Sequence, residues 1–83
     1  MEKEITRFGK NAQEDVIVKL TTYNGHDLID IRAWIRPIPG VDGEEPKPTK
    51  KGISLRVEDI PKLIDALTEA ERIYHDGKEK NPS

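Results

Sequence analysis

One stretch of the sequence combines side chains that can hold single-stranded nucleic acid. In Arg32-x-Trp34-x-Arg36, an indole lies between two guanidinium groups at alternate positions. If this segment is a strand, the three side chains share one face, because successive residues of a strand point to opposite faces. Aromatic rings stack on unpaired bases while neighbouring cations meet phosphates. The pattern therefore indicates a surface for single-stranded nucleic acid, without sequence preference.

Further basic and aromatic side chains are expected near this row, from the preceding strand and the following loop. The predicted nucleic-acid-binding residues are Lys10, Lys19, Tyr23, His26, Arg32, Trp34, Arg36, Lys47, Lys50 and Lys51. The alternative is a protein-interaction module in a transcription or repair complex, since Arg, Trp and Tyr are also enriched at protein interfaces. An isoelectric point near 5.7 favours this alternative.

Residues suited to catalysis or metal binding are nearly absent. The chain has no Cys, and its two histidines, His26 and His75, fall on a predicted turn and near a predicted helix end, without metal-ligand spacing. No Gly-x-Ser-x-Gly motif and no phosphate-binding glycine loop occurs. We therefore expect no enzymatic activity, no metal, no cofactor and no small-molecule substrate.

The elements that must position the basic row are two strands joined by a tight turn. Asp15–Tyr23 and Asp27–Arg36 alternate in side-chain character, and Asn24-Gly25 between them is a strong hairpin signal. The second strand has an apolar row that is expected to face the core: Ile29, Ile31, Ala33 and Ile35.

One more strand is predicted on each side of this hairpin. Glu4–Asn11 comes first, with a bulge expected at Gly9, and Gly52–Arg56 comes last. Between the hairpin and the last strand, Pro37–Lys51 holds four prolines and two glycines. This composition predicts a long loop that contacts the ligand.

The last third of the chain predicts one helix. It is expected to begin near Val57–Asp59, where carboxylates suit the positive end of the helix dipole, and to end at Asp76-Gly77. Residues 1–75 would then form one binding domain and residues 76–83 a polar tail. The helix carries an apolar stripe, which comprises Ile60, Leu63, Ile64, Leu67 and Tyr74.

The small size of the chain favours self-association. With 83 residues, of which 34% are hydrophobic and 36% charged, it has a thin core and no disulfide to reinforce it. Pairing of two copies through the helix stripe would bury more apolar surface, so we expect a homodimer. No secretory signal and no apolar run of membrane-spanning length occurs. These features predict a cytoplasmic protein, associated with the nucleoid if its source is prokaryotic, with no membrane partner.

Three blocks of the sequence carry a resemblance to a known family. Phe8-Gly9-Lys10, Leu28–Trp34 and Lys50–Leu55, followed by a single helix, resemble the single-stranded-DNA-binding domain of the coactivator family known as positive cofactor four. The resemblance covers roughly residues 8 to 74. It implies an α+β fold, with a curved four-stranded antiparallel sheet followed by one C-terminal α-helix. It also implies a two-fold homodimer that binds single-stranded or melted DNA.

At matching positions the resemblance implies DNA contacts by Lys10, Tyr23, Arg32, Trp34, Lys47 and Lys51. The sequence departs from the family at Asn24-Gly25-His26, where lysines are common, and at Ile35, where a second aromatic residue is common. These departures remove positive charge and predict weaker or more salt-sensitive binding. A serine-rich regulatory arm is missing, which predicts a stand-alone type from bacteria or archaea. Its expected partner is single-stranded DNA, with RNA as the alternative.

Overall fold

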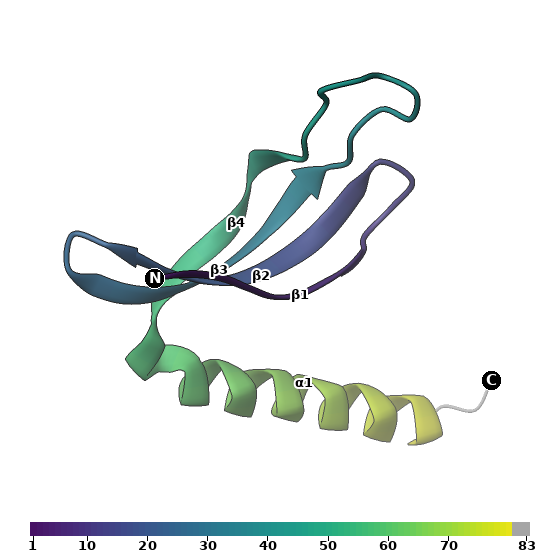
Figure 1. The fold of residues 1–83 in the computed structure, drawn as a ribbon. Coiled ribbons are helices and arrows are strands. Elements are labelled where there is room, and N and C mark those ends of the chain that lie inside the picture. The colour runs from purple at the N-terminus through teal and green to yellow at the C-terminus, as the bar shows by residue number, and fades with distance from the viewer. Residues whose placement is uncertain (81–83) are drawn as a thin grey trace.

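Figure 1 shows one antiparallel sheet, curved and twisted, with a long helix on one side of it. The structure is a computed structural model and describes residues 1–80. Its elements are β1 (Glu2–Gly9), β2 (Glu14–Tyr23), β3 (His26–Ile35), β4 (Lys47–Arg56), the 3₁₀ turn η1 (Val57–Asp59) and α1 (Ile60–Lys80). The strands lie in the order β1-β2-β3-β4, each antiparallel to its neighbours. The predicted α+β fold of four strands and a C-terminal helix is confirmed.

The β2–β3 hairpin forms the middle of the sheet. Asn24 and Gly25 have φ angles of 50° and 76°, the left-handed conformation that a type I′ turn needs at both central positions. The turn places Tyr23 opposite His26, and the pairing continues without a shift to Glu14 opposite Ile35. The predicted turn and hairpin are therefore confirmed.

The register sorts the side chains of the sheet onto two faces, because directly opposed residues point the same way. We call one the polar face; it carries Glu4, Arg7, Ile17, Lys19, Asp30, Arg32, Trp34 and Ser54. The other is the apolar face, which carries Phe8, Val16, Val18, Leu20, Ile29, Ile31, Ala33, Ile53 and Leu55. Lys19 and Arg32 therefore share a face with Trp34, as predicted.

Few side chains are buried within one copy of the chain. Among the described residues, the buried hydrophobic ones are Ile17, Ile29 and Ala33. The predicted core row of β3 is thus buried at two positions, half-buried at Ile31 and exposed at Ile35. The radius of gyration is 16.5 Å, whereas a compact domain of this length has about 12 Å. One copy therefore lacks a closed hydrophobic core.

The two edge strands differ most from the prediction, whereas the bounds of β2 and β3 differ by one residue. β4 begins at Lys47 rather than Gly52, so the β3–β4 loop spans residues 36–46 instead of 37–51. Pro48 fits in β4 because this is an edge strand, where a residue without an N–H is tolerated. At the other edge, β1 spans Glu2–Gly9, and its pairing shifts between Glu4 and Thr6 rather than at Gly9.

Helix α1 is longer than predicted. It passes through Gly77 and ends at Lys80, so the predicted tail from residue 76 is helical that far, and residues 81–83 lie outside the described residues. Gly77 does not adopt the positive φ of a helix-ending glycine, and a 2.8 Å hydrogen bond from Arg72 Nη1 to Asp76 Oδ2 supports the last turns. No helix within residues 1–80 has the length and apolar character of a membrane span.

Candidate nucleic-acid-binding surface

Trp34 lies on the polar face, toward the end of the sheet where β4 begins. It stands opposite Asp15 on β2 and Pro48 on β4. Beside it is an open hollow of about 360 Å³, lined by Glu4, Arg7, Ile17, Lys19, Trp34, Glu45 and Pro46. The hollow brings an aromatic ring and two cations together, which is the combination that base stacking and phosphate contacts require.

The indole of Trp34 interacts with a neighbouring cation. The Nζ atom of Lys19 lies 5.1 Å from the ring centroid, within the range of a cation–π contact. The indole Nε1 atom is covered, and no hydrogen-bond acceptor reaches it among the described residues. Buried donors rarely stay unpaired, so this residue has hydrogen-bonding capacity that the protein itself does not use.

Arg32 is held by groups on two strands. Its Nη2 and Nε atoms donate to the carboxylate of Asp30 at 2.9 and 3.2 Å, and Nη1 donates to the Thr49 carbonyl at 2.9 Å. Ser54 Oγ donates to the same carboxylate at 2.7 Å. Burial alone would raise the pKa of Asp30, but the hydrogen bonds from Arg32 and Ser54 outweigh it and keep that pKa below its usual range. Arg32 therefore joins β3 to β4 as well as facing the surface.

Arg36 follows β3 and contacts the β1–β2 connection. Its Nε atom lies 3.0 Å from Asp15 Oδ1, and its Nη2 atom donates to the carbonyls of Asn11 and Glu14. The sequence pattern placed Arg36 in one row with Arg32 and Trp34. The structure instead uses its guanidinium to hold the chain between residues 11 and 15.

Lys10 and Lys51 converge on one carboxylate. Their Nζ atoms lie 3.4 and 3.6 Å from Glu14 Oε1, and Asn11 Nδ2 donates to the same oxygen at 2.8 Å. Glu14 is buried, with 8% of its surface exposed. The hydrogen bond from Asn11, with support from Lys10 and Lys51, lowers the pKa of Glu14. Glu14 stands opposite Ile35, so this cluster lies at the edge of the apolar face, and not beside Trp34.

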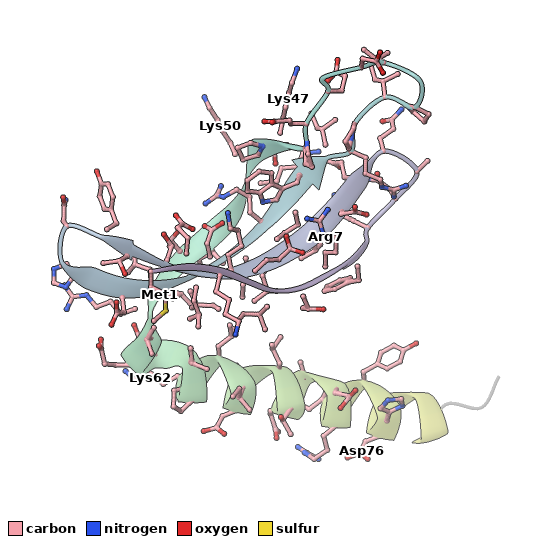
Figure 2. The ribbon with its side chains drawn as sticks, in the orientation of Figure 1. Met1, Arg7, Lys47, Lys50, Lys62 and Asp76 are labelled. Atoms are coloured by element: carbon pink, nitrogen blue, oxygen red, sulfur yellow. The ribbon has the colours of Figure 1, made fainter. Side chains whose placement is uncertain are left out.

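Lys47 and Lys50 form no ion pair with any described residue, unlike Lys10, Lys51 and Arg36 at the same end of the sheet. Both come from the start of β4. Lys47 stands opposite Ile35, at the end of the sheet, and Lys50 lies two residues after Pro48, which stands opposite Trp34. Figure 2 shows both side chains projecting on the side of the sheet away from α1. They are the cations most available to a phosphate at this end of the sheet.

Tyr23 and His26 lie at the opposite end of the sheet from this hollow. They flank the β2–β3 turn, and both are exposed. His26 and Trp34 are eight residues apart on β3, which corresponds to about 26 Å along a strand. The structure therefore does not gather the predicted residues into one patch; it spreads them along the sheet.

Arg7 is a polar-face cation that the sequence interpretation did not include. Its position opposite Ile17 places it on the polar face, and it lines the hollow beside Trp34. The signal was weak because β1 is an irregular edge strand. Counting back two residues from Gly9, which stands opposite Asp15, would have placed Arg7 on this face. Among residues 1–77, whose side chains the structure describes, no cluster of ligating side chains could hold a metal ion.

Comparison with known proteins places these features in a family context. Residues 10–66 match the family described as Transcriptional Coactivator p15 (PC4). The chain is similar to BPSL1147, a PC4 homolog from Burkholderia pseudomallei K96243, in two crystal forms. In the tetragonal form the identity is 28% and the TM-score 0.69, over 86% of this chain and 98% of that one. In the orthorhombic form the identity is 30% and the TM-score 0.71, over 86% and 90%.

A third structure shares the fold at lower identity. It is the bacteriophage T5 homolog of the eukaryotic transcription coactivator PC4, described as implicated in recombination-dependent DNA replication. The identity is 21% and the TM-score 0.64, over 95% of this chain and 90% of that one. A search of curated proteins finds no match.

Proposed function

This chain belongs to the family of Transcriptional Coactivator p15 (PC4), and on that premise we propose that it is a homodimer that binds single-stranded DNA without sequence preference. The family binds nucleic acid and is not enzymatic, and membership implies a DNA-binding role in transcription or DNA maintenance. RNA is the alternative single-stranded ligand.

The observation that carries the proposal is the hollow beside Trp34. An open hollow with one aromatic ring, Lys19 against that ring and two unpaired lysines at the adjacent start of β4 suits a strand whose bases are unstacked. One base would stack on the indole, and its flanking phosphates would meet Lys47 and Lys50. Base stacking does not depend on the identity of the base, which is why we propose binding without sequence preference.

The remaining predicted residues lie apart from the hollow. Tyr23 and His26 lie at the turn end of the sheet, whereas Lys10 and Lys51 lie at the loop end, on Glu14 at the edge of the apolar face. A strand that ran the length of the hairpin would meet an aromatic side chain at each end. Tyr23, with 67% of its surface exposed, is the second stacking platform in this proposal.

The proposed homodimer follows from the apolar surface that one copy leaves open. Helix α1 exposes Ile64, Leu67 and Ile73 at 56, 61 and 56%. On the apolar face of the sheet, Phe8 and Ile53 are also exposed, at 56 and 49%. Exposed apolar patches of this kind mark interaction surfaces. A two-fold pair would bury the helix stripe of Ile60, Leu63, Ile64, Leu67 and Tyr74 against the partner.

The binding proposal is tested by titrating the protein with oligo-dT and with the corresponding duplex while recording the fluorescence of the single tryptophan. We expect quenching by the single strand and little change with the duplex. Equal response to both would remove the single-strand preference. No response to either would favour the protein-interaction alternative for this surface.

The dimer is tested by sedimentation equilibrium, which should give twice the chain mass of 9.4 kDa. Leu67→Asp should give a folded or partly folded monomer, because the carboxylate would be desolvated in the pair. Thr68→Asp adds the same charge one residue away, outside the apolar stripe, and should leave the dimer intact. A wild-type monomer at micromolar concentration would contradict the proposal.

A further inference from the structure

Arg7 and Glu4 form an ion pair inside the hollow beside Trp34. We propose that Arg7 is a phosphate contact of the polar face, and that the carboxylate of Glu4 holds its guanidinium in the free protein and is exchanged for a phosphate on binding. Glu4 would then be a residue that limits affinity. This inference rests on the proposed binding of single-stranded DNA and names two residues that neither the sequence pattern nor the family resemblance indicated.

The position of Arg7 favours contact with a ligand. It lies on β1, an edge strand, opposite Ile17 and on the same face as Trp34. Its side chain is 45% exposed. Figure 2 shows it projecting from the sheet on the side away from α1, the side on which Lys47 and Lys50 also project. A strand stacked on Trp34 would therefore pass within reach of Arg7.

The geometry of the pair suits an exchange of anions. Arg7 Nη2 donates to Glu4 Oε1 at 2.6 Å, and Arg7 Nε donates to Glu4 Oε2 at 2.8 Å. This two-pronged contact is the one that a guanidinium also makes with a phosphate. The hydrogen bond from Arg7 holds the pKa of Glu4 below its usual range, so the carboxylate is ionised at neutral pH and competes as an anion. An exposed pair of this kind contributes little stability, so a ligand can displace it.

The ion pair of Arg32 with Asp30, by contrast, is not suited to exchange its carboxylate for a phosphate. Its side chain is 21% exposed, and its partner Asp30 is 15% exposed. It also donates to the Thr49 carbonyl, and Ser54 supports the carboxylate. Releasing Arg32 would break contacts between β3 and β4, whereas releasing Arg7 breaks only the contact with Glu4, three residues away in the same strand. Of the two arginines, Arg7 is therefore the one free to turn to a ligand.

The helix supplies a matched control. Arg72 and Glu69 are also three residues apart and also form a two-pronged pair, with Nη2 to Oε1 at 2.5 Å and Nε to Oε2 at 3.1 Å. This pair lies on α1, outside the hollow. Glu69→Gln changes the net charge as Glu4→Gln does and removes one carboxylate from an arginine, although Arg72 keeps its 2.8 Å hydrogen bond to Asp76. The variant therefore reports the general effect of charge on DNA binding.

The test measures the affinity for fluorescent oligo-dT by anisotropy for the wild type, Arg7→Ala, Glu4→Gln, the double variant and Glu69→Gln. We expect Arg7→Ala to weaken binding about fivefold, through loss of a charge-assisted contact. Glu4→Gln should tighten it about two- to fivefold, through loss of the competing anion. In the Arg7→Ala background, Glu4→Gln should change nothing, and Glu69→Gln should leave the affinity near that of the wild type.

Two results would overturn the inference. Equal tightening by Glu4→Gln with and without Arg7 would show that only net charge matters. Unchanged affinity of Arg7→Ala, with an unaltered circular dichroism spectrum, would show that Arg7 does not meet the ligand. Failure of the proposed function gives a different result, namely wild-type protein that does not bind oligo-dT at all. Arg7→Lys keeps the positive charge but cannot make the two-pronged contact, so its affinity should lie between that of Arg7→Ala and that of the wild type.

Discussion

The ammonium group of Lys19 lies over the ring of Trp34, with 5.1 Å between the Nζ atom and the ring centroid. The two residues come from neighbouring strands and share the polar face. A base that stacks on the indole would displace this ammonium group, which would then lie beside the phosphates that flank the base. The pair therefore combines a stacking platform and a phosphate contact at one place on the sheet.

Trp34→Ala is expected to lower the affinity for single-stranded DNA by about 1–3 kcal/mol, because one stacking platform is lost. The slope of log affinity against log salt should barely change, since no cation is removed. Trp34→Phe, which keeps an aromatic face, is the control and should retain most of the affinity.

The same Trp34 variants separate a binding role from a structural one. The apolar face holds the buried residues of β3, Ile29 and Ala33, so truncation of Trp34 should cost less stability than the roughly 3–5 kcal/mol typical of a buried aromatic residue. Unchanged affinity in a strongly destabilised protein would remove Trp34 from the binding surface.

Lys47→Ala and Lys50→Ala should each reduce the magnitude of the salt slope by about 0.7, the value for one phosphate contact with a single strand. The reason is that neither lysine has a carboxylate partner among the described residues. Lys62→Ala removes one positive charge from α1 and should leave the slope unchanged. Affinity measured at four or more salt concentrations checks this. Slopes that stay at the wild-type value in both variants would mean that these lysines do not contact phosphate.

Asp30→Asn should destabilise the protein by about 1–3 kcal/mol at neutral pH, because hydrogen bonds to a charged group are lost. The pKa of Asp30 is lowered in the folded state. Its ionised form therefore stabilises the fold above the unfolded pKa near 3.9, and this contribution is lost as the pH falls through the lower folded pKa. The difference between Asp30→Asn and wild type should shrink below about pH 4.

Urea unfolding at several pH values checks the Asp30 prediction. Asp42→Asn, at an exposed position in the β3–β4 loop, should show little difference from wild type at any pH. A difference between Asp30→Asn and wild type that did not depend on pH would mean that the ionised carboxylate contributes nothing specific.

Gly52→Ala should destabilise the sheet by about 1–3 kcal/mol, because a Cβ atom there would lie 2.7 Å from the Ile31 carbonyl oxygen and 2.8 Å from Arg32 Cα. Both neighbours are backbone atoms of β3, so the strand itself would have to move. Gly77→Ala, which meets nothing within 4 Å in α1, should instead stabilise by up to about 1 kcal/mol. Thermal unfolding of the two variants measures both effects, and equal melting temperatures would contradict the close approach at Gly52.

The sequence by itself determined the elements and their order. The period of two in β2 and β3, and the Asn24-Gly25 turn between them, specify a hairpin with one register, and that register puts Lys19, Arg32 and Trp34 on one face. The period of the last third specifies a helix in the same way. These are local properties, decided by the geometry of each element, and so they can be derived from residue order.

Only the tertiary structure decided which charges remain available to a ligand. Sequence pattern treats Arg32, Arg36, Lys10 and Lys47 as equivalent cations, but three of them are paired with carboxylates or carbonyls from other parts of the chain. This pairing depends on the register between strands and on the residue at which β4 begins. Because proline normally interrupts a strand, Pro48 led the sequence interpretation to start β4 too late, whereas an edge strand tolerates a residue without an N–H. Arg7 joined Trp34 for the same reason: the pairing of an irregular edge strand across the sheet is not a local property.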